Sequence, residues 1–214
     1  MFKRLILLAL PIAVLQASSL HFPDPTTDIP ASSAKNKEKV VFAGGCFWGV
    51  EAVFESLKGV SSAVSGYAGG NKGTANYETV STGRTGHAES VEVTYDPSQI
   101  SFGQLLKVYF SVVHDPTQLN RQGPDYGTQY RSAIFYTNDD QKRVAEAYIQ
   151  QLEEAKVFKH KIVTQVVPLE GFYAAEGYHQ HYLVHHPDQP YIVYNDLPKL
   201  QQLHKEFPDL VKTK

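Results

Sequence analysis

Val41-Phe42-Ala43-Gly44-Gly45-Cys46-Phe47-Trp48-Gly49 contains the single cysteine and the single tryptophan of the chain. The apolar run over residues 40–43 begins with two β-branched residues, which is typical of a strand. The glycine pair that follows indicates a tight turn. Beyond the turn, apolar residues recur at helical spacing: Phe47, Val50, Val53, Phe54 and Leu57. The stretch therefore predicts a strand, a turn and a helix, with Cys46 in the first helical turn.

The start of a helix favours a thiolate over a thiol, because unpaired backbone N–H groups and the positive end of the helix dipole lie there. A helix end is worth about 0.3–2 kcal/mol to a nearby anion, and one pKa unit corresponds to about 1.4 kcal/mol. The dipole is therefore expected to lower the pKa of Cys46 by about one unit. The glycines leave room for a reactant, yet a buried, inert cysteine fits the turn equally well.

The composition describes one globular unit. The chain has 214 residues, 42% of them hydrophobic, and a formal net charge of −2. This is enough for one sizeable core, and residues 39–214 are predicted to form a single domain. The near-neutral charge argues against a nucleic-acid partner. One cysteine excludes an internal disulfide and a thiolate metal cluster within one chain.

Residues 1–19 have the pattern of an export signal peptide. Lys3 and Arg4 precede an apolar run over residues 5–15 that is too short to span a bilayer, and small residues follow it. We therefore predict an exported, periplasmic or otherwise extracytoplasmic protein; the alternative is an uncleaved N-terminal membrane anchor. Residues 20–38 are rich in Pro, Ser, Thr and Lys and predict a disordered linker. Exported proteins usually pair their cysteines, so the lone Cys46 favours a reactive role.

The remaining pattern predicts an α/β fold, an α+β two-layer sandwich. Further strands are expected at 60–67, 89–95, 131–137 and 162–169, and helices at 46–57, 102–113, 138–155, 174–185 and 197–207. Ser101 and Gln104 have the spacing of a capping box. The order contains the β-α-β-β-α-β pattern of a ferredoxin-like core, with a mixed sheet and additional C-terminal helices. The loops at 71–86 and 117–129 have lengths that are usually functional.

Short blocks along the chain carry a family resemblance. They are Gly45-Cys46-Phe47-Trp48-Gly49, Ser65-Gly66-Tyr67-Ala68-Gly69-Gly70, Asn76-Tyr77-Glu78, Thr85-Gly86-His87-Ala88-Glu89, Gly127-Thr128-Gln129-Tyr130-Arg131-Ser132 and Glu176-Gly177-Tyr178-His179-Gln180. In this order and at this spacing they resemble the methionine sulfoxide reductase A family, the peptide-methionine (S)-S-oxide reductases. The resemblance covers about residues 40–207. It implies a ferredoxin-like core and thiol-dependent reduction of methionine (S)-sulfoxide, free or in proteins, without a cofactor or a metal ion.

The resemblance also implies roles for individual residues. Cys46 matches the nucleophile that attacks the sulfoxide sulfur, and Glu89 matches the acid that protonates the sulfoxide oxygen. This is compatible with the chemistry, because breaking the S–O bond requires a proton on the leaving oxygen. A carboxyl is ionised at pH 7 in water, but burial and a nearby thiolate both raise its pKa. Cys46 and Glu89 are therefore expected to titrate as a coupled pair that shares one proton near neutral pH.

The other matched positions describe a pocket for a group that is polar at S=O and apolar at its methyl. Tyr77 and Tyr130 match phenols that hydrogen-bond the oxygen, Phe47 and Trp48 match the wall that holds the methyl, and Asp125 matches a nearby polar partner. Without the blocks, the aromatic residues would be ordinary core or surface residues. Asp125 would then be a turn cap, and Glu89 an exposed carboxylate at a strand start.

This chain departs from many family members because it has no cysteine after Cys46. A sulfenic acid on Cys46 therefore requires an external thiol, either a thioredoxin- or glutaredoxin-like protein or a small thiol. The tail over residues 190–199 resembles that of members without C-terminal cysteines, and His181 stands where an acidic residue is expected. His181 and His185 have the spacing of zinc ligands, in a cluster with His179 and His186. No acid-rich motif or cysteine accompanies the cluster, so no metal site is predicted. A monomer is expected.

Two other functions stay open at this point. One is a Cys/Glu hydrolase or acyl transferase, for which His87 could serve as the general base. The other is a secreted peptide-binding module that uses the aromatic pocket without chemistry. Thiol-dependent conversion of a methyl sulfoxide distinguishes the reductase from both.

Overall fold

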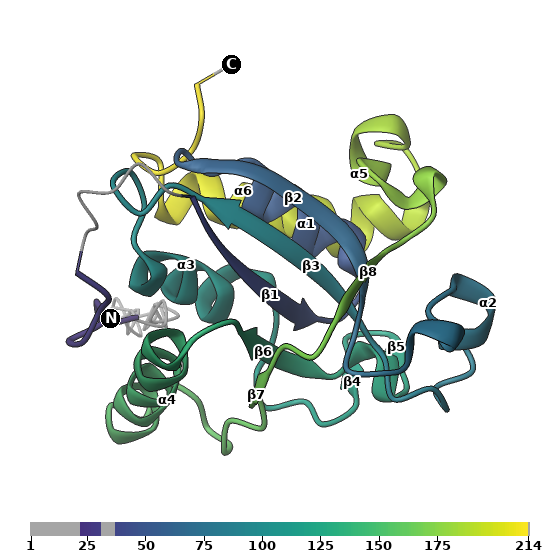
Figure 1. The fold of residues 1–214 in the computed structure, drawn as a ribbon. Helices are drawn as coiled ribbons and strands as arrows, with labels where there is room; N and C mark the ends of the chain where they lie inside the picture. The colour runs from purple at the N-terminus through teal and green to yellow at the C-terminus, as the bar shows by residue number, and fades with distance from the viewer. Residues whose placement is uncertain (1–21, 31–36, 214) are drawn as a thin grey trace, which may run out of the picture.

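The computed structural model of the protein describes residues 22–30 and 37–213. Their centre is a six-stranded sheet in the order β7-β6-β1-β3-β2-β8 (Figure 1). The strands are β1 (Glu38–Gly44), β2 (Val60–Ala68), β3 (Ala88–Tyr95), β6 (Ser132–Tyr136), β7 (Gln165–Pro168) and β8 (Phe172–Ala174). A separate hairpin pairs β4 (Arg121–Gln122) with β5 (Asp125–Tyr126). The signal peptide predicted at residues 1–19 lies outside the described residues.

The predicted ferredoxin-like core is confirmed. Within β6-β1-β3-β2 every neighbouring pair is antiparallel, and β7 adds to β6 in parallel, so the sheet is mixed. The helix α1 (Phe47–Glu55) connects β1 to β2, and α3 (Phe102–Val108) lies between β3 and β6. This is the β-α-β-β-α-β order. β1 is therefore an interior strand, and its C-terminal end, which carries the turn to Cys46, is held from both sides.

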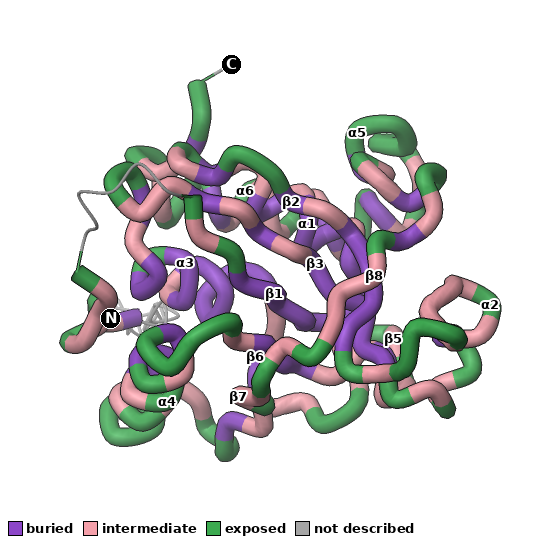
Figure 2. The backbone as a smooth tube through the Cα atoms, in the orientation of Figure 1, coloured by how far each residue is buried: buried purple, intermediate pink, exposed green. Residues whose placement is uncertain are grey.

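The sheet buries both of its faces. Val40 and Phe42 of β1 belong to the main core with α1, α3, α4 (Asp139–Glu154) and α6 (Leu197–Glu206). The alternate residues Val41 and Ala43 belong to a smaller cluster that Phe172 and its neighbours cover. Figure 2 shows the buried backbone along the central strands, while α2 (Tyr77–Val80) and α5 (Tyr182–His185) each combine buried, intermediate and exposed residues.

Helix α3 begins where the sequence predicts. Ser101 Oγ accepts a hydrogen bond from Gln104 N–H at 3.1 Å, and Gln104 Oε1 accepts one from Ser101 N–H at 2.9 Å. This capping box satisfies two N–H groups at the start of the helix. The helix then widens into a π turn over Tyr109–Val113.

Ser101→Ala is expected to lower the free energy of unfolding by about 1 kcal/mol, because it removes the acceptor of the cap. Urea denaturation measures this change. Ser101→Asp keeps an acceptor oxygen and is expected to retain most of the stability. An alanine variant as stable as the original protein would contradict the assignment.

Two predictions about the ends of the domain are wrong. The helix expected at 174–185 is instead β8, a 3₁₀ turn (Gly177–His179) and α5. The chain changes direction at His181, whose φ is 52°. The linker expected at 20–38 packs on the domain over residues 22–30, where Phe22 lies edge-on against Phe158 with ring centroids 5.7 Å apart. Residues 20–21 and 31–36 of the predicted linker lie outside the described residues.

Candidate active site

Cys46 lies at the N-cap of α1, directly after β1. Gly45 has a φ of +90°, and a Cβ there would lie 2.7 Å from the Gln122 side chain, so the turn requires glycine. Cys46 is a free thiol with 8% of its surface exposed. The turn thus places one nearly buried sulfur at the point where the sheet meets α1.

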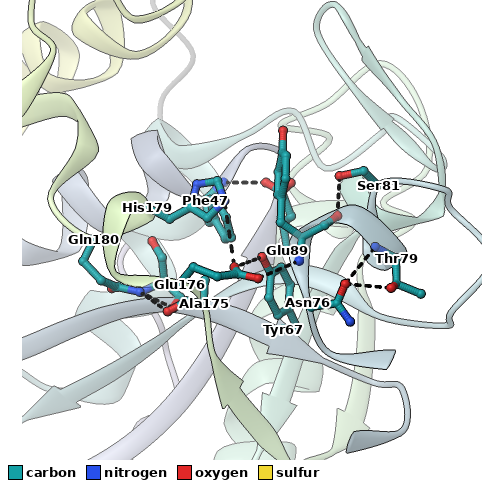
Figure 3. A network of polar contacts seen from close by, with 12 residues as sticks. Phe47, Tyr67, Asn76, Thr79, Ser81, Glu89, Ala175, Glu176, His179 and Gln180 are labelled. Carbon is teal, nitrogen blue, oxygen red and sulfur yellow. Dashed lines mark hydrogen bonds and ion pairs between the residues drawn. The ribbon is translucent and has the colours of Figure 1, made fainter. Parts of the chain in front are cut away.

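Glu89 comes from the neighbouring strand and reaches the same turn. It is 3% exposed, and its Oε2 accepts a hydrogen bond from Phe47 N–H at 3.1 Å (Figure 3). Burial raises the pKa of Glu89 to about 8, even though this hydrogen bond lowers it, and the charges of Asp125 and Asp196 raise it further. At pH 7 the carboxyl is therefore mostly protonated, which is the state that a general acid requires.

The thiol is also held protonated, so the pair carries two protons at pH 7 rather than the one expected, and the expectation from the helix dipole is wrong as well. Burial raises the pKa of Cys46 well above its ordinary value, and the charges of Glu89 and Asp196 raise it further. The backbone N–H of Trp48 and the charge of Lys199 act in the opposite direction but are weaker. The helix start does favour the thiolate, but the loss of water around the sulfur outweighs it.

Of the two predicted phenols, Tyr77 lies on the first loop singled out in the sequence and Tyr130 directly follows the second. Tyr77 begins α2, where Asn76 Oδ1 caps the helix by accepting Thr79 N–H. Tyr130 ends the 3₁₀ turn Thr128–Tyr130. Both side chains are half-buried. Burial, then the charge of Glu89, raises the pKa of each phenol, and the charge of Cys46 contributes to both. The fold therefore brings both hydroxyls into the field of the same carboxyl and sulfur.

Phe47 and Trp48 form an aromatic wall that follows Cys46. Their ring centroids are 6.5 Å apart, and Trp48 is stacked on Tyr182 at 3.8 Å. Trp48 Nε1–H donates a hydrogen bond to His179 Nδ1 at 3.2 Å. Burial lowers the pKa of His179, which keeps its ring neutral and able to accept this bond. The wall is thus fixed on its outer side by residues that lie more than 130 positions along the chain.

The block around Glu176 supports the site from behind, a role that the sequence pattern did not assign. Glu176 Oε2 accepts a hydrogen bond from Tyr67 OH at 2.9 Å (Figure 3). Its Oε1 accepts one from Tyr77 N–H, also at 2.9 Å. Gln180 joins the edge of β2 through Ser65, accepting its N–H at 3.0 Å and donating to its carbonyl at 2.9 Å. Glu176 therefore fixes the backbone from which the Tyr77 side chain projects.

Asp125 lies on the β4–β5 hairpin and is engaged by the C-terminal tail. Its Oδ2 accepts a hydrogen bond from Tyr191 OH. The Tyr191 ring stands edge-on to Trp48, with centroids 5.9 Å apart. Tyr191 was missed in the sequence, where it is one of 13 tyrosines. Only the resemblance of the tail pointed to this segment.

A pocket of about 650 Å³ opens onto Cys46. The wall of this pocket also includes Asp125, Tyr191, His114 and Lys199, while Glu89 and the two phenols are not part of it. Burial lowers the pKa of His114 to about 3, so this histidine is a weak base. His87, the base considered for a hydrolase, instead bonds the Asn71 carbonyl through Nε2 at 3.0 Å. Neither His114 nor His87 is therefore suited to act as a general base for Cys46, whereas Glu89 is suited to act as an acid.

The histidine cluster does not form a metal centre in the described part of the chain. Among residues 22–30 and 37–213, no group of three or more His, Cys, Asp or Glu side chains is arranged to hold a metal ion. His181 Nδ1 lies 3.1 Å from Glu55 Oε2 instead. Within the same residues, no helix has the length and apolar character needed to cross a bilayer.

Comparison with known proteins identifies the family. The family model described as "Peptide methionine sulfoxide reductase" matches residues 38–210. The peptide methionine sulfoxide reductase MsrA 2 of Mesorhizobium japonicum is 61% identical over 182 residues, covering 85% of this chain and 93% of the relative. The protein of the same name from Synechocystis sp. is 55% identical over 192 residues, covering 89% and 90%.

Solved structures agree with this. Methionine sulfoxide reductase A of Corynebacterium diphtheriae superposes with a TM-score of 0.62 at 38% identity, covering 72% of this chain and 77% of that one. Mxr1 from Saccharomyces cerevisiae in reduced form gives 0.65 at 32% identity, covering 76% and 90%. The chain therefore belongs to the peptide methionine sulfoxide reductase A family and is a thiol-dependent oxidoreductase that reduces methionine (S)-sulfoxide.

Proposed function

We propose that Cys46 is the nucleophile of this reductase and Glu89 its general acid. The observation that carries this proposal is the bond from Phe47 N–H to the buried Glu89 carboxyl, because it places a protonated acid at the turn that holds the sulfur. Phe47 and Trp48 form the wall for the substrate methyl. Tyr77 and Tyr130 donate hydrogen bonds to the sulfoxide oxygen. Asp125 is a further polar group of the site, and the hydrogen bond from Tyr191 OH holds its carboxylate in place.

The first step transfers oxygen from the substrate to the enzyme. The Cys46 sulfur attacks the sulfoxide sulfur while Glu89 protonates the oxygen. The S–O bond of the substrate breaks and an S–O bond forms on Cys46, so two electrons pass from the cysteine sulfur to the substrate sulfur. The oxygen and the proton from Glu89 end on Cys46 as a sulfenic acid, the thiol proton passes to the Glu89 carboxylate and restores the acid, and methionine leaves.

The second step consumes an external thiol. This chain has no other cysteine, so the incoming thiol attacks the sulfenic acid directly, forms a mixed disulfide with Cys46 and releases water. A second thiol then restores Cys46 and leaves as the other half of a disulfide. The pocket of about 650 Å³ beside Cys46 offers the incoming thiol a path that the acid and the phenols do not line. A thioredoxin- or glutaredoxin-like protein or a small thiol suits this step.

We also propose that the enzyme is exported from the cytoplasm. The basic, apolar and small-residue pattern of residues 1–19 supports export, which would place the enzyme where oxidised proteins outside the cytoplasm are repaired.

A single-turnover experiment tests the chemistry. Purified protein is mixed with either epimer of methionine sulfoxide and no reductant, and its mass is measured. We expect one added oxygen on the peptide that contains Cys46, with one methionine formed per enzyme, from the S epimer only. A protein that gains no oxygen, or that gains it on another residue, would contradict the assignment of Cys46.

A further inference from the structure

The C-terminal tail brings a second buried carboxyl to the helix that carries Cys46. Asp196 ends the π turn Ile192–Asp196, immediately before α6, and is 0% exposed. It packs against Gly49 in the first turn of α1. A Cβ at Gly49 would lie 2.1 Å from Asp196 Oδ1 and 2.9 Å from Lys199 Nζ. The missing side chain at Gly49 is therefore what lets this carboxyl approach the backbone beside Cys46.

Only one of the two carboxylate oxygens of Asp196 has a hydrogen-bond partner in the described part of the chain. Its Oδ1 accepts a hydrogen bond from Lys199 Nζ at 3.0 Å. Its Oδ2 is buried and has no hydrogen-bond partner within the described part of the chain. A buried carboxylate is expensive unless its oxygens are satisfied, so this arrangement is a poor device for stability alone. Burial raises the pKa of Asp196, while the charge and the hydrogen bond of Lys199 act in the opposite direction and favour the carboxylate. Lys199 also lines the pocket that opens onto Cys46.

Several titratable or charged groups share this region, and Asp196 acts on the two that react. A fixed negative charge in a poorly solvated site opposes a second negative charge nearby. The charge of Asp196 disfavours ionisation of both Cys46 and Glu89. The groups that face Cys46, Glu89 or Asp196 from the surrounding elements are Tyr77, His114, Asp125, Tyr130, Tyr191 and Lys199.

We propose that Asp196 is a positioning residue that keeps protons on the Cys46–Glu89 pair by holding a buried negative charge against the first turn of α1. This rests on the proposed function and deepens it. Oxygen transfer uses both protons of the pair: Glu89 gives its proton to the leaving oxygen, and the thiol proton replaces it on Glu89 as the sulfur attacks. Asp196 keeps both in place until the substrate arrives. It also keeps the lone sulfur as a thiol, which alkylating and oxidising reagents attack more slowly than a thiolate.

The test uses Asp196→Asn, with Asp209→Asn as a matched control. Asp209 is an exposed carboxylate beyond α6 that is not part of the wall of the pocket. Two rates are measured across pH: alkylation of Cys46 by iodoacetamide, which needs no sulfoxide, and single-turnover oxygen transfer. In D196N, alkylation at pH 7 should be at least about threefold faster, since about half a pKa unit changes the thiolate fraction by that factor. The rate of oxygen transfer in D196N should begin its alkaline decline at a lower pH than in the original protein.

The two readouts move in opposite directions at alkaline pH, which a loosened structure would not produce. Alkylation profiles of D196N that match those of D209N and the original protein would overturn the proposal, as would a D196N alkylation profile shifted to higher pH. A slowing of both reactions together would also overturn it. Because alkylation involves no sulfoxide, a failure of Glu89 as the acid would leave the alkylation result intact.

A second variant covers the case in which D196N folds poorly because Lys199 loses its partner. Asp196→Asn combined with Lys199→Met leaves no unpaired charge. The charge of Asp196 acts on Cys46 more strongly than that of Lys199. Alkylation of the double variant should therefore shift in the same direction by a smaller amount. A shift to higher pH in the double variant would overturn the proposal.

Discussion

Glu89→Gln is expected to slow single-turnover oxygen transfer by about 10²–10⁴-fold, the usual contribution of a general acid. Glutamine keeps the shape of the side chain and can accept the hydrogen bond from Phe47 N–H. It cannot give a proton to the leaving oxygen. Sulfoxide binding should change little, because the phenols and the aromatic wall remain. Rapid-quench measurement of the methionine formed by enzyme without reductant gives the rate.

The pH dependence of the same rate adds a second readout. Burial raises the pKa of Glu89 to about 8, so the acid is protonated below that pH and loses its proton above it. The rate should therefore be flat near pH 7 and fall as the pH rises through about 8. This alkaline decline should be absent in E89Q, because its amide does not titrate. Glu92→Gln, on the same strand, keeps Glu89 and should retain both the rate and the decline.

A single-turnover rate in E89Q equal to that of the original protein would contradict the role of Glu89. A rate that falls in E92Q as much as in E89Q would assign the effect to the strand rather than to the carboxyl.

Cys46→Ser is expected to abolish turnover. A serine oxygen cannot accept the sulfoxide oxygen and cannot form a sulfenic acid. Substitution of the atom that makes the new bond usually removes all catalysis beyond that of binding. Substrate binding should persist. The single tryptophan stands in the methyl wall, so quenching of its fluorescence by methionine (S)-sulfoxide reports binding directly.

This variant also separates the reductase from the peptide-binding module considered at the outset. Retained binding with no methionine formed, in the presence of a thiol, is the result expected for the reductase. Residual turnover in both Cys46→Ser and Cys46→Ala would show that the chemistry does not pass through Cys46. An original protein that binds sulfoxide but never converts it would favour the binding module.

The sequence predicted the framework of the site because that framework is local. The strand, glycine turn and helix around Cys46 follow from apolar spacing within a short stretch, and Glu89 lies near the start of an alternating strand. The antiparallel register then sets the two strands side by side. Short-range patterns of this kind specify which elements form and which residues they present.

The sequence could not predict what long-range packing decides. The pKa of Cys46 is raised, whereas the helix dipole predicts that it is lowered, because the burial of the sulfur depends on segments far along the chain. Asp196 and Tyr191 lie in a tail whose local pattern predicts only a turn and a helix. Their roles depend on contacts with distant elements: Asp196 packs against Gly49 of α1, and Tyr191 bonds Asp125 on the β4–β5 hairpin. The 174–185 helix failed for a related reason, since Glu176 and Gln180 bind distant partners.

The ordered segment at residues 22–30 defines where a recombinant form of this enzyme can safely begin. Phe22 is buried and contributes to the wall of the pocket beside Cys46. Asp28 Oδ1 accepts Gly103 N–H on α3, and the Pro23 carbonyl accepts Tyr148 OH on α4, so the segment clamps two helices. A fragment that begins at residue 38, where the family match begins, would lose these two hydrogen bonds and the part of the pocket wall that Phe22 forms. Cys46 would then be more accessible to reagents in solution. Expression vectors should therefore start upstream of Phe22.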